Sequence, residues 1–208
     1  LCTIAAPLYL LVVVRWLPPE QRLPALVFVP FSALGEYIFS ILFGWYDYKF
    51  GAVPLYVPFG HAILFSTGLL IEDQPWVQRH LAQVRWALVA FLAALFAGAV
   101  IALGDTLSLA LGVLFLYILY RKRMRLLYLI MGVLVLYIEL VGTQFGCWTW
   151  RQAAWGALHT TNPPVGAFVC YVIADILVLK LSARLQPLLA RRPALARPFR
   201  ALDEETTV

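Results

Sequence analysis

The sequence has few charged residues for its length. Asp, Glu, Lys and Arg make up 13% of the 208 residues, whereas 62% are hydrophobic. A water-soluble domain of this size needs charge on roughly a quarter of its residues. Long apolar runs instead follow one another almost without interruption. The shortage of charge excludes a soluble enzyme, a disordered chain and a secreted disulfide scaffold, and it predicts a membrane protein.

Metal-binding residues and catalytic motifs are also scarce. The three cysteines, Cys2, Cys147 and Cys170, show no CxxC or Cys/His spacing, and the chain has only three histidines, too few for a histidine-rich di-iron centre. No GxSxG, HExxH, P-loop or GxGxxG pattern occurs, so serine hydrolases, zinc proteases and nucleotide-binding proteins lack support. We expect neither a metal nor a cofactor. The net charge of +5 is spread between apolar segments, which argues against a nucleic-acid partner.

Apolar segments divide the chain into seven predicted transmembrane helices. One span needs about 20 residues to cross a hydrocarbon core of about 30 Å. Only Gly104 and Asp105 interrupt residues 86–120, and merging that stretch would give six spans. The predicted spans are residues 1–14, 25–44, 53–71, 86–103, 105–120, 126–146 and 164–183.

The positive charges favour seven spans and give an orientation. With seven, 14 of the 16 Lys and Arg residues lie on one side, and only Lys49 and Arg151 lie opposite. The positive-inside rule then places the N-terminus outside and the C-terminus in the cytoplasm. We therefore predict an all-α transmembrane domain over residues 1–183. Residues 184–208 form a basic cytoplasmic tail, which we expect to lie against anionic membrane lipids.

Two stretches of the chain resemble each other. Glu36 precedes the sequence FGWYDY at 43–48, and Glu139 precedes FGCWTW at 145–150. Each stretch contains an acid in an outward-running helix, a Phe-Gly exit, an aromatic connection and prolines that mark the return helix. This pattern indicates a 3+1+3 arrangement, in which two three-helix repeats are related by an axis along the membrane normal.

Polar side chains inside the spans are the candidate site. A charged group within a span costs about 2.5–3.5 kcal/mol, so Glu36, Glu139 and Asp175 are functional candidates, and His61 lies at a similar depth. Because lipid offers them no partner, we expect these groups to surround a common cavity. The expected substrate-binding residues are Trp45, Tyr48, Trp148, Trp150, Tyr171 and Gln144.

Simpler interpretations exist for the same residues. The aromatic residues of the outer connections are typical of an interfacial belt. Glu36 and Glu139 could be protonated groups that hold helices together by hydrogen bonds, and His61 could be an ordinary buried hydrogen-bonding residue. Under this alternative the chain is a noncatalytic membrane subunit or a lipid-binding protein.

An apolar cavity with carboxylic acids and aromatic walls suits carbocation chemistry. A neutral carboxylic acid protonates an olefin or epoxide, aromatic faces stabilise the cation, and a carboxylate removes a proton at the end. Asp175, the deepest acid, is the expected general acid, and Glu36 or Glu139, helped by His61, is the expected base. The two assignments could be reversed. Lipid-soluble isoprenoids are the expected substrates.

The same residues resemble known families. Glu36 with FGWYDY and PLYVP at 54–58, and ELVGTQFG at 139–146, look like elements of integral-membrane carotenoid hydratases and small lycopene cyclases. The placement of Glu36 and Asp175 is also similar to the seven-span membrane terpene cyclases of meroterpenoid pathways. This resemblance implies an isoprenoid cyclase or hydratase. The PxE(E/D) acid pair of the small lycopene cyclases is missing. Microbial rhodopsins need a lysine in the middle of span seven, and Lys180 lies too near its inner end.

Overall fold

The computed structural model describes residues 1–190, which are mostly helical. A π-helical segment η1 (Tyr37–Leu42) continues α2, and a 3-10 turn η2 (Val165–Ala167) leads into α8. The α-helices of this part of the chain are α1 (Cys2–Trp16), α2 (Pro19–Glu36), α3 (Val57–Glu72), α4 (Pro75–Arg79), α5 (Leu81–Leu103), α6 (Thr106–Arg121), α7 (Leu126–Gln144) and α8 (Phe168–Ala190).

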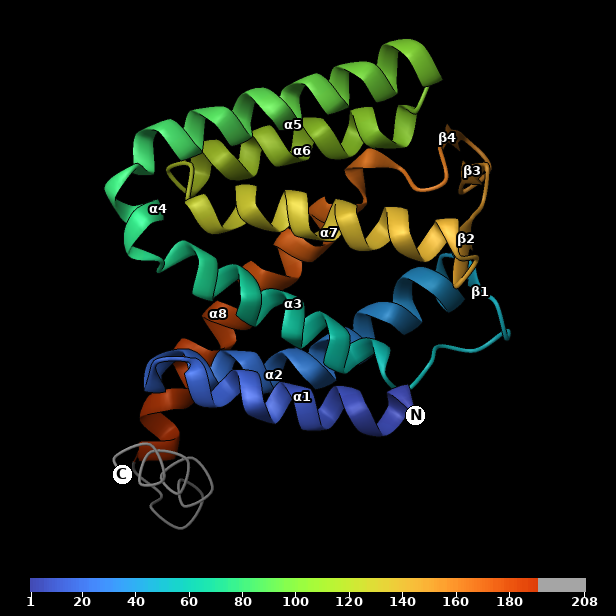
Figure 1. Ribbon diagram of the computed structural model, residues 1–208. Coiled ribbons are helices and arrows are strands. Elements are labelled where there is room, and N and C mark those ends of the chain that lie inside the picture. Colours follow the sequence, from blue (N-terminus) through green and yellow to red (C-terminus); the bar gives the residue numbers. More distant parts are fainter. Residues whose placement is uncertain (191–208) are drawn as a thin grey trace.

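Seven of these helices are apolar and run between two opposite ends of the molecule (Figure 1). Four helical segments are long and apolar enough to cross a membrane, namely Pro19–Leu42, Leu81–Leu103, Leu126–Gln144 and Val165–Leu189. The other three, α1, α3 and α6, are apolar but shorter. Each segment predicted from the sequence therefore forms one helix. The N-terminus lies at the same end as the short strands, and α4 lies at the other end (Figure 1).

The short interruption at Gly104 and Asp105 does separate two helices. Gly104 has a φ of +64°, a left-handed conformation that glycine adopts at little cost. The Asp105 carboxylate then accepts hydrogen bonds from the Ser108 backbone N–H (2.8 Å) and the Ser108 hydroxyl (2.8 Å). This N-cap starts α6. Residues 86–120 thus form an antiparallel pair of helices, as the charge pattern predicts.

Helices α2, α3, α7 and α8 surround the centre of the fold. Helix α2 packs against α3 and α8, and α7 packs against the same two helices. Phe28 of α2 stacks on Phe65 of α3, with ring centroids 4.9 Å apart. Gly68 of α3 lets α7 approach closely, because a Cβ there would lie 2.8 Å from the sulfur of Met131. The other helices flank this ring: α1 packs against α3, and α5 packs against α7.

Short strands at the end that carries the N-terminus join the two predicted repeats. Strands β1 (Tyr46–Tyr48) and β2 (Trp148–Trp150) pair antiparallel, with Tyr46 opposite Trp150 and Tyr48 opposite Trp148. A second small sheet is formed by β3 (Ala153–Ala154) and β4 (Leu158–His159). The prediction of an all-α chain is wrong at these connections. Aromatic residues that alternate along an extended segment pack well as a strand pair.

The predicted boundary between domain and tail falls inside α8. This helix passes residue 183 and continues to Ala190, so the first residues of the predicted tail are helical. The rest of the tail, residues 191–208, lies outside the described residues.

Candidate functional site

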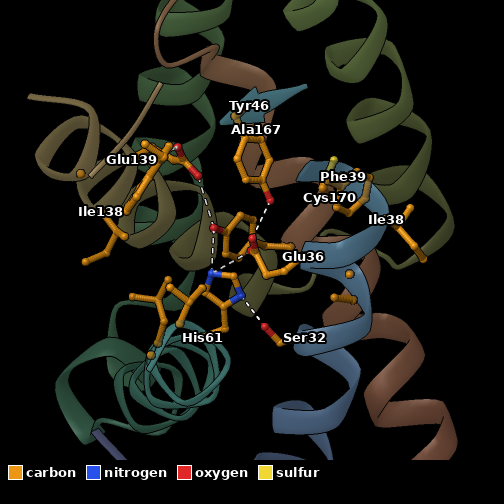
Figure 2. A pocket seen from close by; sticks show the side chains of 18 of the residues that line it. Ser32, Glu36, Ile38, Phe39, Tyr46, His61, Ile138, Glu139, Ala167 and Cys170 are labelled. Atoms are coloured by element: carbon orange, nitrogen blue, oxygen red, sulfur yellow. Dashed lines mark hydrogen bonds and ion pairs between the residues drawn. The ribbon is translucent and has the colours of Figure 1, made fainter. Parts of the chain in front are cut away.

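A cavity of about 580 Å³ lies between α2, α3, α7 and α8, beneath the β1–β2 pair (Figure 2). Its walls are mostly apolar and aromatic, with contributions from Phe28, Phe39 and Trp45. Its polar side chains come from all four helices. They include Ser32 and Glu36 of α2, His61 of α3, Glu139 of α7 and Tyr171 of α8.

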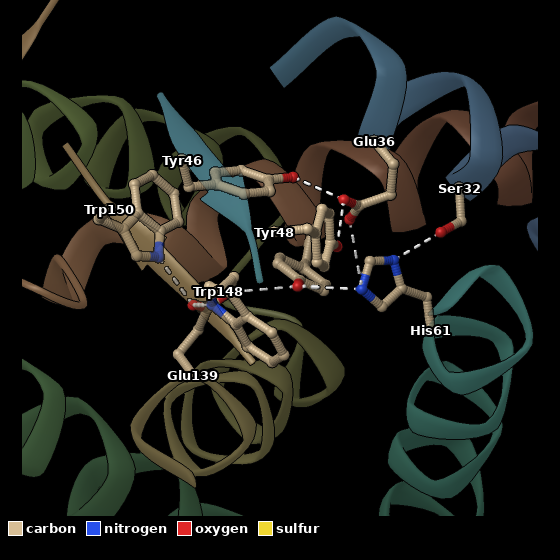
Figure 3. Close-up of polar contacts among 9 residues, drawn as sticks. Ser32, Glu36, Tyr46, Tyr48, His61, Glu139, Trp148 and Trp150 are labelled. Atoms are coloured by element: carbon tan, nitrogen blue, oxygen red, sulfur yellow. Dashed lines mark hydrogen bonds and ion pairs between the residues drawn. The ribbon is translucent and has the colours of Figure 1, made fainter. Parts of the chain in front are cut away.

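Glu36 is held by two phenols from the strand that follows it. Its Oε2 atom accepts hydrogen bonds from the hydroxyl groups of Tyr46 (2.7 Å) and Tyr48 (2.6 Å), as Figure 3 shows. Its Oε1 atom lies 3.5 Å from Nε2 of His61. The period of two along β1 points both tyrosines to the same face. One strand thus fixes one side of the carboxyl group, and the other side faces His61.

Glu139 is held in the same way by two indoles. Its Oε2 atom accepts hydrogen bonds from Nε1 of Trp148 (2.9 Å) and Nε1 of Trp150 (3.0 Å) (Figure 3). The Tyr171 hydroxyl donates to its Oε1 atom at 3.3 Å. These donors come from β2 and α8. Glu139 therefore has the same arrangement of partners as Glu36, with indoles in place of phenols.

His61 and Tyr171 connect the two acids. The Tyr171 hydroxyl lies 3.1 Å from Nε2 of His61 as well as near Glu139. The other ring nitrogen of His61, Nδ1, lies 2.5 Å from the Ser32 hydroxyl. A path of polar contacts therefore runs from Glu36, across the 3.5 Å contact with His61, and through hydrogen bonds of Tyr171 to Glu139. Such a path can pass protons between the two carboxyl groups, because imidazole and phenol both donate and accept.

The two halves of the site differ by one inserted residue. Phe43 follows Glu36 by seven positions, whereas Phe145 follows Glu139 by six. The first stretch contains the π-helical segment η1, and the second stays α-helical to Gln144. A π-turn accommodates one extra residue in a helix. This local π geometry lets both glutamates reach the strand that follows them despite the unequal spacing.

An ion pair and burial shift the pKa values of side chains at the strand end of the cavity. Arg151 binds Asp47 through two hydrogen bonds of 2.9 Å, and these bonds lower the pKa of the Asp47 carboxyl group. Burial, followed by the nearby Glu36, raises the pKa values of Tyr46 and Tyr48. Both phenols therefore remain protonated donors at neutral pH.

Asp175 does not belong to this cavity, contrary to the sequence-based expectation. It is fully buried on α8, and neither carboxyl oxygen has a hydrogen-bond partner among the described residues. The cavity wall of α8 is formed by Cys170, Tyr171, Ala174 and other residues on a different side of the helix. Asp175 follows Tyr171 by four positions, yet only Tyr171 lines the cavity, so four-residue spacing does not by itself bring Asp175 into it.

Two further expectations need correction. Gln144 is exposed and does not line the cavity. It follows Glu139 by five positions, which at about 100° per residue turns it away from the Glu139 face. The aromatic residues of the connections are not simply an interfacial belt either. Trp45, Tyr48 and Trp150 are buried cavity residues, and Trp148 also lines the cavity, whereas Trp155 is exposed.

Sequence reasoning missed two polar residues of the cavity and one buried acid outside it. Ser32 lies four residues before Glu36 on the same helical face, and this spacing was an available signal. Tyr46 alternates with Tyr48, which only a strand assignment could reveal. Asp105 is buried, and it also accepts a hydrogen bond from the Thr161 hydroxyl at 2.6 Å. This contact joins the α5–α6 turn to the segment that leads into α8.

Within residues 1–190, no group of three or more His, Cys, Asp and Glu side chains could hold a metal ion. The polar groups of the cavity instead pair with one another and with phenol and indole donors. Comparison of the chain with family models, with curated proteins and with solved structures finds no match. The function of the cavity has to be inferred from its own chemistry.

Proposed function

We propose that this protein is an integral-membrane enzyme that performs acid/base chemistry on a hydrophobic isoprenoid without a cofactor. Cyclisation, hydration and isomerisation are the reactions in this class. The observation that carries the proposal is the pair Glu36 and Glu139, which face one apolar cavity and are joined through His61 and Tyr171. A cavity of about 580 Å³ is of the size that holds one small-molecule ligand.

The hydrogen-bond donors give the two acids different roles. An indole N–H only donates, so Trp148 and Trp150 favour Glu139 as a carboxylate acceptor. Phenols and imidazole can donate or accept, so the partners of Glu36 tolerate either protonation state. Glu36 with His61 is therefore the proton-transfer group. Glu139 is the fixed anion that stabilises positive charge.

The reaction follows from these roles. Glu36 transfers its proton to one carbon of a double bond, and the electron pair of that bond forms the new C–H bond. The cation left on the other carbon lies among aromatic faces and near Glu139, which stabilise it. Loss of a proton to the Glu36–His61 pair forms a new double bond and restores the enzyme. In a hydration, water adds to the cation instead, and the resulting oxonium group loses a proton to the Glu36–His61 pair to give an alcohol.

The membrane arrangement belongs to the same proposal. Seven helices cross the bilayer, the N-terminus is outside, and the C-terminus is cytoplasmic. The 14-to-2 asymmetry of Lys and Arg supports this orientation. The matching partners of Glu36 and Glu139 support a 3+1+3 repeat, with the site between the two three-helix units. The resemblance to carotenoid hydratases and membrane terpene cyclases agrees with this chemistry.

A noncatalytic subunit is the second candidate. The observation that favours it is that Oε2 of each glutamate already binds two donors, as expected of acids that fix helix packing. The cavity beside these acids is the argument against it, because packing contacts leave no room for a ligand. A serine hydrolase has less support. Ser32 contacts His61, but it lies inside α2, where backbone N–H groups are engaged and cannot form an oxyanion hole.

Deuterium incorporation tests the enzyme proposal. Isoprenoids that copurify with the protein are identified by mass spectrometry, and the purified protein is incubated with them in D₂O. The product should gain deuterium at the protonated carbon. Glu36→Gln and Glu139→Gln should each slow turnover about a hundredfold or more, and Asp175→Asn should change it by no more than about threefold. Full activity in both glutamine variants, each with a normal unfolding temperature, would favour the noncatalytic subunit.

A further inference from the structure

The strand end of the cavity is closed. The inward residues of the β1–β2 pair, Tyr46, Tyr48 and Trp150, are buried, and so is Trp45 just before β1. On the outward side, Asp47 and Arg151 clamp the two strands together. A ligand entering from this end would have to break both the clamp and the hydrogen bonds to the glutamates. Entry from the aqueous phase at the strands is therefore disfavoured.

One side of the cavity reaches the surface of the helix bundle. Leu34 of α2 is 59% exposed and Leu177 of α8 is 44% exposed, yet both line the cavity. Ile38 and Ile173 lie one turn away on the same two helices and also line it. Residues that belong to both the cavity wall and the outer surface mark an opening. This opening is apolar and would face lipid.

The cavity is elongated along the helices, and its polar groups gather toward one end. Along η2 and α8 its wall runs from Ala167 to Leu177, a rise of about 15 Å. The polar groups lie nearer the strand end. The remainder of the wall, which includes Phe28, Phe31 and Leu64, is apolar. This shape fits a chain whose reacting part lies beside the acids and whose hydrocarbon tail lies toward the other end.

We propose that an isoprenoid chain enters this cavity sideways from the bilayer, through a portal between α2 and α8 lined by Leu34, Ile38, Ile173 and Leu177. The inference rests on the proposed function and adds the route and the orientation of its substrate. The reacting double bond lies between Glu36 and Glu139, and the tail lies toward Phe28. A chain longer than the cavity extends through the portal into lipid, so the site accepts elongated isoprenoids in preference to compact, water-soluble ones.

The gap between α3 and α7 is the rival route. Val141 of α7 lines the cavity and is 37% exposed. Ile63 and Leu64, the cavity residues of α3 on that side, are only partly exposed. The α2–α8 side has two well-exposed wall residues on facing helices, whereas the α3–α7 side has one. The two routes can be separated by blocking each with a bulky residue.

Photolabelling in liposomes tests the portal. The full chain is reconstituted with a geranylgeraniol that carries a diazirine in its tail, irradiated, and mapped by peptide mass spectrometry. We expect label on residues of the apolar end of the cavity such as Phe28 and Leu64, with competition by unmodified geranylgeraniol. Leu34→Trp and Leu177→Trp should each lower this labelling about tenfold, which corresponds to about 1.4 kcal/mol. Leu140→Trp, at an exposed α7 position outside the cavity wall, should leave it unchanged.

Two results would overturn the portal: unchanged labelling in both α2–α8 variants, or a larger loss in Val141→Trp than in Leu177→Trp. Each variant is first checked for a normal unfolding temperature, so that misfolding is not counted as blocking. Labelling also separates this inference from the proposed function. If the wild-type cavity is labelled and Leu177→Trp prevents that labelling, the portal is supported even if no isoprenoid is converted. Turnover lost in Glu36→Gln with no effect of the portal variants supports the enzyme alone.

Discussion

Four carboxyl side chains are buried among the described residues, and their partners separate their roles. Glu36 and Glu139 bind aromatic donors at the edge of a cavity. Asp105 caps a helix and binds Thr161. Asp175 has no hydrogen-bond partner within residues 1–190. Burial alone therefore does not identify the acids of the candidate site, and an adjoining cavity is the more useful criterion.

Loss of the Asp105 carboxylate should destabilise the protein without changing the cavity. Asp105→Ala removes the α6 cap and leaves the buried Ser108 hydroxyl group without its acceptor. We expect a loss of about 2–4 kcal/mol in unfolding free energy, measured by denaturant titration in micelles. Asp73→Ala, at an exposed loop position, is the control and should cost far less. An equal effect of the two substitutions would show that the Asp105 contacts contribute little.

At the scale of elements, the site depends on how closely α7 approaches the strand after it. The Trp148 ring lies directly over Gly142, where an added Cβ would come within 2.0 Å of a ring carbon. The same ring donates its N–H to Glu139, one turn earlier on α7. Gly142 thus provides the space that lets β2 fold back over the acid. Between Glu36 and β1, the π-helical segment η1 accommodates one extra residue and so lets β1 fold back over that acid.

A methyl group at Gly142 should displace Trp148 and disturb the Glu139 site. Gly142→Ala is expected to destabilise the protein by about 1–3 kcal/mol through overpacking and to lower turnover, with a change in tryptophan fluorescence. Gly98→Ala on α5 is the matched control, since nothing lies within 4 Å of its added Cβ. There the higher helix propensity of alanine should stabilise the protein by up to about 1 kcal/mol. A normal emission spectrum and full stability in Gly142→Ala would contradict the close packing.

At the scale of the whole molecule, the distribution of charge and the direction of the helices agree. The strands and the N-terminus lie at one end, and α4 lies at the other (Figure 1). The sequence places Arg123 in the connection between α6 and α7 and Arg151 just after β2. These connections lie at opposite ends of α7. The proposed topology therefore puts the two arginines on opposite sides of the membrane.

Single-cysteine labelling tests this topology. Cys2, Cys147 and Cys170 are replaced by serine, and one cysteine is then introduced at Arg123 or Arg151. In intact cells, a membrane-impermeant maleimide should label the cysteine at position 151 and should reach position 123 only after permeabilisation. The positive-inside rule gives this direction. Labelling of both positions in intact cells would contradict the proposed arrangement.

Much of the fold could be predicted because one physical requirement dominates it: each apolar run has to form a helix whose backbone groups are satisfied within the helix. Each predicted apolar run coincides with one apolar helix, with ends that differ by up to seven residues, and Gly104 with Asp105 marks a real break. Glu36, Glu139, His61 and Tyr171 were also predicted correctly to share one cavity. Asp175 and Gln144 were wrongly included, because helical spacing gives a direction around one axis but not the position of the neighbouring helix or the reach of a side chain.

The sequence by itself determined the apolar helices, the sidedness of the basic residues and the polar groups that must find partners away from lipid. These properties depend on composition and local periodicity, which are written along the chain. Only the tertiary structure decided that β1 and β2 pair across about 100 residues, that phenols bind one glutamate and indoles the other, and that exposed residues of α2 and α8 line the cavity. Such contacts depend on packing between distant segments, where a shift of one residue around a helix turns a side chain from the cavity toward a neighbouring helix.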